Sequence, residues 1–247
     1  GACPSIQRVI SSGEAVLPSH VRMLKAAFSN AGFYNLYGPT EAAIEVSFWE
    51  APTHYYEEDF VPIGRPSWNT QLHILDEHGK LVPIGVPGEL HIGGTQVARG
   101  YLNHPLLSAE KFIPDPFETG ARLYKTGDLA AWLPNGQIKY LGRKDDQVKV
   151  RGYRIELGEI NEILSQCSQV KNSVVVANKD KHGQVRLIAY VVPVKALDKK
   201  EVESFLKAKL PEYMIPSVWM EMEALPLNSN GKIDRKHLPT PDATALS

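Results

Sequence analysis

The pattern of apolar residues and turns changes near residue 145, and this change constrains the fold more than any other feature of the sequence. Before it, short alternating runs such as GELHIGG (88–94) are separated by turn signals, including Asn135-Gly136. Such runs predict a small antiparallel barrel or sheet. The start of the chain instead predicts an apolar strand at 8–10, a helix at about 18–30 and a second short strand, which is an α/β arrangement.

A compact α+β unit is predicted after this change. Two helices are indicated by apolar residues at helical spacing: Leu157, Ile160, Ile163 and Leu164 in the first, and Val202, Phe205, Leu206 and Leu210 in the second. Apolar runs predict strands at 173–177, 186–192 and 218–222. We therefore expect the end of a large α/β-plus-β-barrel domain over residues 1–144, a small α+β subdomain over 145–240 and a linker over 241–247.

Composition excludes several classes of function. With 247 residues, 43% of them hydrophobic, the chain can bury a sizeable core. Lys+Arg 27 against Asp+Glu 28 gives a net charge of -1, which argues against a nucleic-acid partner. Cys3 and Cys167 are too far apart in the sequence to indicate a disulfide framework or a zinc site. There is no signal peptide and no apolar run near the ~20 residues of a membrane span, so we expect a cytoplasmic protein.

The stretch NLYGPTEAAIE (35–45) carries the most chemistry. Tyr37 can stack on a base, and Gly38 lets the backbone approach a ligand closely. Thr40 offers a hydroxyl, and Glu41 offers the hard carboxylate oxygen that Mg²⁺ prefers. The alternative is an ordinary turn at the capped start of a helix.

Three further stretches place polar groups on turns or near the change of pattern. Asp128, in YKTGDLA, is predicted on a tight turn, where a carboxylate can bind the two hydroxyls of a ribose or simply cap the turn. Arg143 opens a charged run that reads as a solvated hairpin or as a phosphate and ribose contact. Asn230-Gly231 favours a tight turn, so Lys232 is predicted on a short loop, as a surface residue or as a group that reaches a site.

The order of these motifs resembles the later core motifs of amino-acid adenylation domains of nonribosomal peptide synthetases, which belong to the acyl- and aryl-CoA ligase and luciferase superfamily. The resemblance covers nearly the whole chain and rests on NLYGPTE, GELHIGG…ARGYL, YKTGDL, GRKDDQVKVRGYRIELGEI, LPEYMIP and NGKIDR. It implies ATP-dependent activation of an amino acid to aminoacyl-AMP, with Mg²⁺. It also implies transfer to the phosphopantetheine thiol of a peptidyl carrier protein. The alternatives are an acyl- or aryl-CoA ligase and a non-catalytic half that binds a partner.

The resemblance also implies roles for individual residues. Those assigned to ATP are Gly13, Glu14, Asn35, Tyr37, Gly38, Thr40, Asp128, Tyr140 and Arg143. Tyr37 would stack on adenine, Asn35 would contact the base edge and Asp128 would bind the ribose hydroxyls. Glu41 would hold Mg²⁺, and Thr40 would touch the α-phosphate.

Other roles implied by the resemblance concern the small subdomain, which rotates between two half-reactions. Asp145 matches the hinge, and Lys149 and Gly152 match the segment that faces the site during thioester formation. Lys232 matches the catalytic lysine that bridges the substrate carboxylate and the α-phosphate during adenylation.

The resemblance places the substrate side chain against one set of residues: Ile10, Ser12, Leu36, Gly38, Ile44 and Glu45. Most of them are apolar or small. Glu45 is the exception, because a carboxylate in such a pocket is costly unless it is paired. Either another residue neutralises it, or the substrate does so through a basic or hydrogen-bond-donating side chain.

Some parts of the family pattern are absent. The phosphate loop of the form SGTTGxPKG does not occur, and neither does the aspartate that pairs with the substrate's α-ammonium. We therefore expect about half of an adenylation domain, inactive without an N-terminal part on the same polypeptide or on a separate chain. Gln96, Asn161 and Asn228 stand where the family usually has glycine, glutamate and threonine, which leaves local loop geometry open.

Overall fold

The computed structural model describes residues 5–52, 60–150, 152–179, 185–228 and 231–241. The chain divides into two compact units, Gly1–Asp145 and Asp146–Ser247, which are called the N-terminal unit and the C-terminal unit below. Among the described residues, no helix combines the length and the apolar character needed to cross a bilayer. Each unit has its own core and is described by itself.

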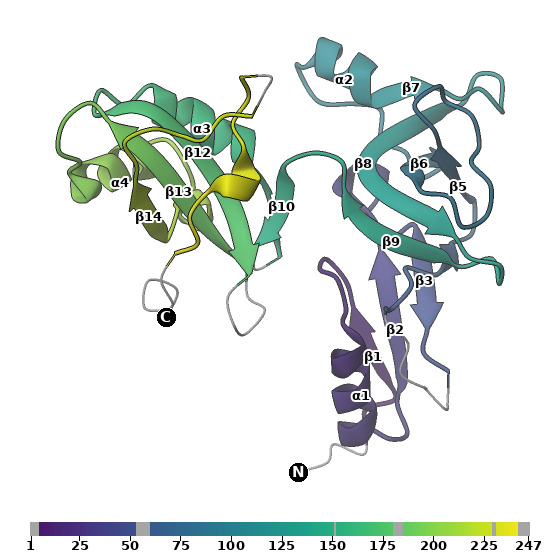
Figure 1. The fold of residues 1–247 in the computed structure, drawn as a ribbon. Coiled ribbons are helices and arrows are strands. Elements are labelled where there is room, and N and C mark those ends of the chain that lie inside the picture. The colour runs from purple at the N-terminus through teal and green to yellow at the C-terminus, as the bar shows by residue number, and fades with distance from the viewer. Residues whose placement is uncertain (1–4, 53–59, 151, 180–184, 229–230, 242–247) are drawn as a thin grey trace. The chain divides into compact units, whose positions relative to one another are not determined.

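The N-terminal unit begins with a four-stranded sheet in the order β1-β2-β3-β4. Its strands are β1 (Arg8–Ser11), β2 (Gly32–Tyr37), β3 (Ser47–Glu50) and β4 (Arg65–Pro66). Helix α1 (Pro18–Ala27) connects β1 to β2, and these two strands are parallel, which confirms the expected α/β arrangement. Val21 of α1 packs on Phe33 and Trp49, so the helix covers one face of this sheet (Figure 1).

The second sheet of this unit has five antiparallel strands and matches the expected strand-and-turn pattern. Its strands are β5 (Thr70–Leu75), β6 (Gly88–Gly94), β7 (Phe112–Pro114), β8 (Arg122–Trp132) and β9 (Ile138–Arg143), with helix α2 (Pro105–Lys111) before β7. Strand β8 pairs with β6 on one side, while β7 and β9 share its other side. Tyr37, Ala42 and Val46 belong to the same core as Ile92 and Ile138, so one core joins the two sheets.

The predicted tight turn at Asp128 is wrong, because Asp128 lies inside the long strand β8. Gly127 has a φ of 73°, which kinks the chain without ending the strand. The N–H of Asp128 donates to Thr126 Oγ1 at 2.9 Å and the N–H of Lys144 donates to the Gly127 carbonyl at 2.8 Å. These bonds hold the kink, which aims the Asp128 side chain while the ladder continues on both sides.

The C-terminal unit opens with the hairpin of β10 (Gln147–Val150) and β11 (Tyr153–Glu156), which leads into α3 (Leu157–Ser165). A three-stranded sheet follows, made of β12 (Val170–Lys179), β13 (Val185–Pro193) and β14 (Val218–Glu221), with α4 (Lys199–Lys207) after β13. Strands β12 and β13 are antiparallel, and β14 is parallel to β13.

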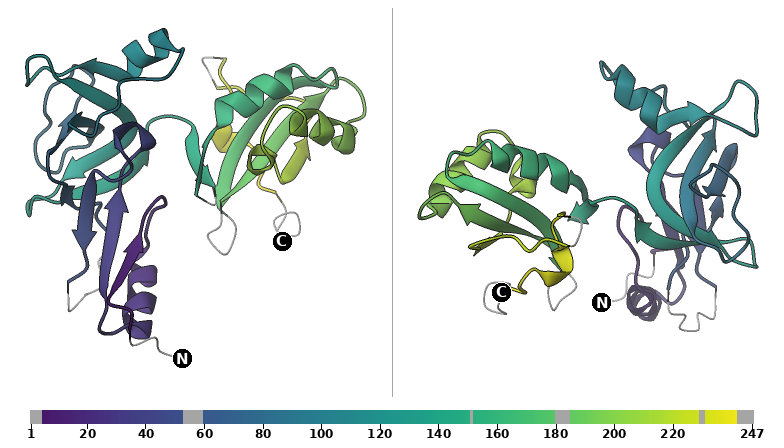
Figure 2. Two further views of the ribbon diagram at one scale, coloured as in Figure 1. Left: turned by 180° about the vertical axis from the view of Figure 1, so that it is seen from behind. Right: turned by 45° about the horizontal axis from the view of Figure 1, so that its top comes forward.

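Both faces of the three-stranded sheet are covered. Leu157, Ile160 and Leu164 of α3 are buried with Val202 and Leu206 of α4 against one face, as their helical spacing predicts (Figure 2). Leu225 and Leu238, from the segment after β14, pack on the other face. Tyr190 Oη donates to the Pro239 carbonyl at 2.6 Å and fastens that segment to the sheet. This segment carries Lys232.

Candidate active site

Several of the residues predicted to contact the nucleotide and the substrate lie at one edge of the first sheet. Because β1 and β2 are parallel, with Ser11 paired to Asn35, their carboxyl ends lie side by side. Gly13, with a φ of 87°, and Glu14 follow β1, while Gly38 follows β2. In open α/β sheets, ligands bind in the crevice outside the carboxyl ends of the strands. The topology therefore brings these residues to the edge at which such sheets bind ligands, called the binding edge below.

Asp128 is the centre of the polar cluster at this edge, and only 7% of it is exposed. Arg143 Nη1 donates to Asp128 Oδ1 at 2.9 Å, and Tyr140 Oη approaches the same oxygen at 3.4 Å. Tyr37 Oη donates to Oδ2. A carboxylate has about four acceptor sites, so these donors leave about one for a further hydroxyl. Four of the predicted nucleotide residues are thus in direct contact.

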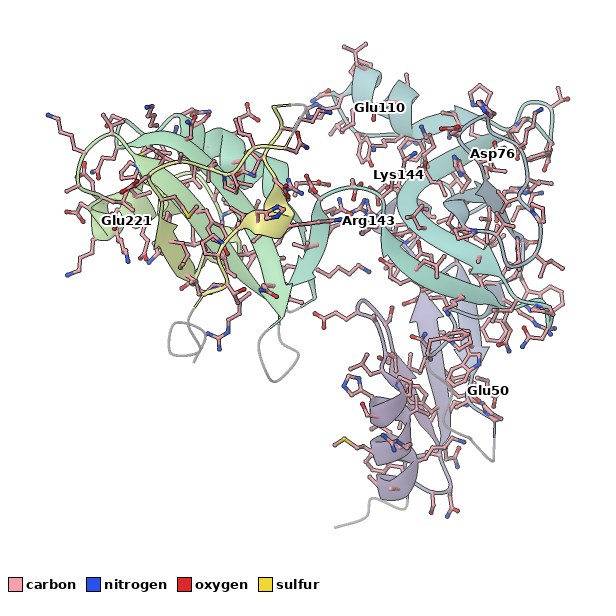
Figure 3. All side chains as sticks on the ribbon, in the orientation of Figure 1. Glu50, Asp76, Glu110, Arg143, Lys144 and Glu221 are labelled. Carbon is pink, nitrogen blue, oxygen red and sulfur yellow. The ribbon has the colours of Figure 1, made fainter. Side chains whose placement is uncertain are left out.

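Arg143 also holds the predicted hinge residue. Its Nε and Nη2 donate to the two carboxylate oxygens of Asp145 at 2.8 and 2.6 Å, and Nη1 donates to the Thr126 carbonyl at 2.7 Å. Burial lowers the pKa of Arg143, but the bonds to Asp145 and the charge of Asp128 outweigh burial and raise it. The guanidinium at the end of β9 (Figure 3) is therefore a permanent cation that joins Asp128 to Asp145.

The two tyrosines beside Asp128 remain neutral hydrogen-bond donors. Burial, and after it the negative charge of Asp128, raises the pKa of Tyr37 well above 10 and also raises the pKa of Tyr140. Their ring centroids are 6.3 Å apart and the planes are tilted by 41°. Tyr37 is 9% exposed, so a base would stack on a ring that is already largely covered by protein.

The turn after Tyr37 requires glycine at position 38. A Cβ added to Gly38 would lie 2.1 Å from the carbonyl oxygen of Ile44. Ile44 itself has a φ of 78°, which is costly for a β-branched residue, and it is held by an N–H bond to the Pro39 carbonyl at 3.2 Å. Thr40 begins a single 3₁₀ turn, Thr40–Ala42, which has no side-chain cap.

Glu41 is held by a residue whose role the sequence interpretation missed. Tyr101 Oη donates to Glu41 Oε1 at 2.6 Å, and burial, followed by this bond, raises the pKa of Tyr101. Within the described ranges, no group of three or more His, Cys, Asp or Glu residues could hold a metal ion. Mg²⁺ usually keeps several waters and takes one or two carboxylates plus substrate phosphates. Glu41 fits Mg²⁺ in that way, as a single oriented protein carboxylate.

Asn35 is buried in β2, whereas two of the predicted pocket residues, Ile10 and Ile44, are exposed. Asn35 is 4% exposed, and its Nδ2 donates to the Pro62 carbonyl at 2.8 Å. An amino group on a base would have to donate to the other end of this side-chain amide, the oxygen Oδ1. Ile10 and Ile44 are 61% and 64% exposed, and Leu36 is half-buried. Ser12 Oγ donates to Glu45 Oε1 at 2.7 Å.

Lys232 lies on a hairpin turn of the C-terminal unit. The N–H of Asn228 donates to the Lys232 carbonyl at 2.8 Å, and the N–H of Lys232 donates to Asn228 Oδ1 at 3.1 Å. Leu227 and Ile233 form an antiparallel bridge, and Gly231 has a φ of 73°. The expected tight turn is therefore present, although Asn230 is outside the described residues. Asn228, a departure from the family pattern, supplies an acceptor that closes the turn.

Other predicted and unpredicted residues of the C-terminal unit lie near its start. Lys149 is exposed on β10, and Gly152, with a φ of 81°, is in the turn before β11. Arg235 donates to both carboxylate oxygens of Asp146, from Nη1 to Oδ1 and from Nη2 to Oδ2, and the second bond is 2.6 Å long. The sequence interpretation gave no role to this ion pair, whose partners are too far apart in the sequence for a local pattern to reveal.

The two remaining departures from the family pattern also make specific bonds. Gln96 Nε2 donates to the Glu45 carbonyl at 3.1 Å. Asn161 Nδ2 donates to the Leu157 carbonyl at 2.9 Å, and its Oδ1 accepts from the Val175 N–H at 2.8 Å, which ties α3 to β12. The local geometry at these positions is therefore stabilised by the residues that are present.

Comparison with known proteins identifies many similar sequences. Tyrocidine synthase 3 of Brevibacillus parabrevis is 48% identical over 237 residues, which are 96% of this chain and 4% of that protein. Gramicidin S synthase 2 of Brevibacillus brevis is 45% identical over 237 residues, with 96% and 5% covered. The chain thus spans a small fraction of the length of these relatives.

Solved structures share the fold. The Vibrio cholerae adenylation domain AlmE, in complex with glycyl-adenosine-5'-phosphate, superposes with a TM-score of 0.83 at 30% identity, covering 94% of this chain and 44% of that chain. Holo-PA1221, a nonribosomal peptide synthetase protein containing adenylation and PCP domains, gives 0.82 at 27% identity, with 93% and 40% covered.

Two family models match the two parts of the chain. The one described as AMP-binding enzyme matches residues 1–102, and the one described as AMP-binding enzyme C-terminal domain matches residues 159–232. Together with the relatives above, these matches extend over both compact units. The chain belongs to the AMP-binding enzyme family, and within it to the adenylation domains of nonribosomal peptide synthetases.

Proposed function

We propose that this chain is part of an enzyme that uses ATP to activate an amino acid as aminoacyl-AMP and then transfers the aminoacyl group to a peptidyl carrier protein. The cluster of Tyr37, Tyr140 and Arg143 around Asp128 is the observation that carries this proposal. The complex of AlmE with glycyl-adenosine-5'-phosphate and the PCP domain of PA1221 support the two half-reactions by analogy.

In the first half-reaction, an oxygen of the amino-acid carboxylate attacks the α-phosphorus of ATP and pyrophosphate leaves. Asp128 accepts from a ribose hydroxyl at its remaining acceptor site while Arg143 keeps it oriented, and the side-chain oxygen Oδ1 of Asn35 accepts from the adenine amino group. Thr40 would face the α-phosphate, and Glu41, whose carboxylate is oriented by Tyr101, would hold Mg²⁺. Bound Mg²⁺ neutralises charge on the phosphate oxygens.

Lys232 supplies positive charge for the same step. A compact ammonium can contact the substrate carboxylate and an α-phosphate oxygen together, and it stabilises the charge that develops between them. Asp145 is the hinge at which the C-terminal unit changes orientation. Lys149 and Gly152 then face the site while the phosphopantetheine thiolate attacks the acyl carbon and AMP leaves.

The test is ATP–pyrophosphate exchange by the complete adenylating protein. Exchange that depends on an amino acid, followed by labelling of a holo carrier protein with that amino acid, is the expected result. Exchange with aryl or fatty acids alone would replace the proposal with an acyl- or aryl-CoA ligase. Absence of exchange with every acid, in a protein that is folded by circular dichroism, would favour a non-catalytic binding role.

A further inference from the structure

Glu45 is a carboxylate at the binding edge that has no charged partner among the residues that the structure describes. Its side chain accepts from Ser12, the first residue after β1, at 2.7 Å. Its backbone is fixed on both sides, because its N–H donates to the Ala43 carbonyl at 3.0 Å and its carbonyl accepts from Gln96 at 3.1 Å. Glu45 therefore belongs to the same edge as Gly38 and lies beside the carboxyl ends of β1 and β2.

Within the described residues of the N-terminal unit, no cation pairs with Glu45. Glu45 Oε2 is buried and has no hydrogen-bond partner among the described residues. Every lysine and arginine of residues 1–145 lies in the described ranges, and none of them forms an ion pair with Glu45. Arg143, the strongest cation near this edge, is already committed to Asp128 and Asp145.

A half-buried carboxylate in this condition is costly, because it has lost water at one oxygen and gained no compensating donor. Neighbouring positions supply no cation, since Ile10 of β1, Leu36 of β2 and the adjacent Ile44 are apolar. Ile10 and Ile44 keep most of their surface exposed in this unit. Exposed apolar side chains near a single carboxylate suit a ligand that has an alkyl stem and a positive group at its tip.

We propose that Glu45 binds the side-chain cation of the amino acid that this enzyme activates, so that the substrate is a basic amino acid with a guanidinium or ammonium tip. This inference rests on the proposed function and names its substrate class. Ser12 orients the carboxylate, and a guanidinium or ammonium supplies donors and charge to it. The strained turn at Ile44 places the carboxylate where it meets the ligand.

The test compares substrates in ATP–pyrophosphate exchange by the complete adenylating protein. Arginine, ornithine and lysine are measured against leucine and norleucine, which match the stem but lack the charge. We expect kcat/KM for the best basic amino acid to exceed that for norleucine by at least about 10²-fold, as expected when a charge pair is buried. Glu45→Gln should lower it about 10²-fold for the basic substrate and change it less than about 3-fold for uncharged ones.

Glu50→Gln is the matched control, since Glu50 is an exposed carboxylate on the neighbouring strand β3 and bonds only to Tyr34 at 3.0 Å among the described residues. It should leave the selectivity unchanged. If uncharged amino acids support exchange better than all basic ones, Glu45 is neutralised by the protein and the inference is wrong while the proposed function stands. If no amino acid supports exchange, the proposed function itself fails. The substrate profile of the unaltered protein decides the matter even where Glu45→Gln does not fold.

Discussion

The Asp128 cluster and the Lys232 hairpin represent two different ways to present a charged side chain. Asp128 is 7% exposed and receives hydrogen bonds from Tyr37, Tyr140 and Arg143. The Lys232 side chain is exposed, and within the described residues its ammonium has no hydrogen bond or ion pair. The first is preorganised, so a ligand hydroxyl would bind to it with little loss of side-chain freedom. The second is free to enter and leave a site, which suits a charge needed in only one of two steps.

Removing Lys232 tests this contrast with the largest expected effect. Lys232→Ala should lower the rate of adenylation by about 10²–10³, the range for loss of one group that stabilises charge in the transition state. Transfer of preformed aminoacyl-AMP to the carrier protein should change much less. Burst-phase measurement of each half-reaction in the complete protein gives the two rates.

A neighbouring lysine provides the control for this experiment. Lys236 is also exposed and lies in the 3₁₀ turn Arg235–His237, a few residues further along. Lys236→Ala should leave both half-reactions within about 2-fold, as expected for an exposed charge that is screened by solvent. Equal losses in both half-reactions for Lys232→Ala would remove the role assigned to Lys232 in adenylation alone.

The preorganised side of the comparison is tested at Asp128. Asp128→Asn keeps the shape of the side chain but removes its charge and turns one acceptor into a donor. Hydrogen bonds to charged groups contribute about 1.5–3 kcal/mol, so we expect the KM for ATP to rise by about 10- to 100-fold. Asp76→Asn is the control, because among the described residues the Asp76 side chain accepts only from the backbone N–H groups of His78 and Lys80, in a surface turn. An unchanged KM for ATP would exclude Asp128 from ribose binding.

Arg143 tests whether the cluster depends on one planar cation. Lysine cannot reproduce the fork that reaches Asp128, Asp145 and the Thr126 carbonyl together. Arg143→Lys should therefore lower the free energy of unfolding of this chain by about 1–2 kcal/mol, measured by urea titration.

Arg122→Lys is the matched control for this variant. Arg122 is exposed, donates to the backbone carbonyls of Arg99 and Ala98 at 2.7 and 3.1 Å and lies over the Phe112 ring, and among the described residues it pairs with no carboxylate. Its replacement should cost less than about 0.5 kcal/mol, as is usual for surface substitutions. A cost for Arg143→Lys no larger than this would show that the contacts to the two carboxylates contribute little net stability.

The same comparison shows which parts of the molecule can be predicted from the sequence: those that depend on neighbouring residues. Strand β6 has the bounds of the predicted run at 88–94, and the apolar face of α3 is the one given by Leu157, Ile160 and Leu164. Such elements are determined by local periodicity, and so is the Lys232 turn, which needs only neighbouring residues.

The contacts within the site depend instead on residues distant in the sequence. Ser12 and Glu45 are 33 positions apart, and Glu41 and Tyr101 are 60 apart. Asp128 was predicted on a tight turn, but the pairing of β8 with β6 and β9 keeps it inside the strand. Tertiary pairing is invisible to a local pattern, so the resemblance supplied the residue roles and the structure supplied their contacts.

The smallest effect expected concerns alkaline pH and Tyr140. Burial and Asp128 raise the pKa of Tyr140 in the folded protein above its value of about 10 in the unfolded chain. The stability it contributes is therefore complete below pH 10 and is lost as the pH rises through the folded pKa. Tyr140→Phe removes this titration together with a long bond of 3.4 Å.

The free energy of unfolding of Tyr140→Phe should differ from that of the unaltered chain by less than about 1 kcal/mol at pH 7. Above pH 10, however, its decline with pH should be shallower by up to about 1.4 kcal/mol per pH unit, the value for one proton. Urea titrations of both proteins at several pH values between 8 and about 11 give the two slopes. Lysines and the other tyrosines are present in both proteins, so the difference between the slopes reports on Tyr140 and on its charge coupling to Tyr37. Identical slopes would mean that its hydroxyl ionises as readily in the folded chain as in the unfolded one, and the Asp128 cluster would then be less closed to water than its burial indicates.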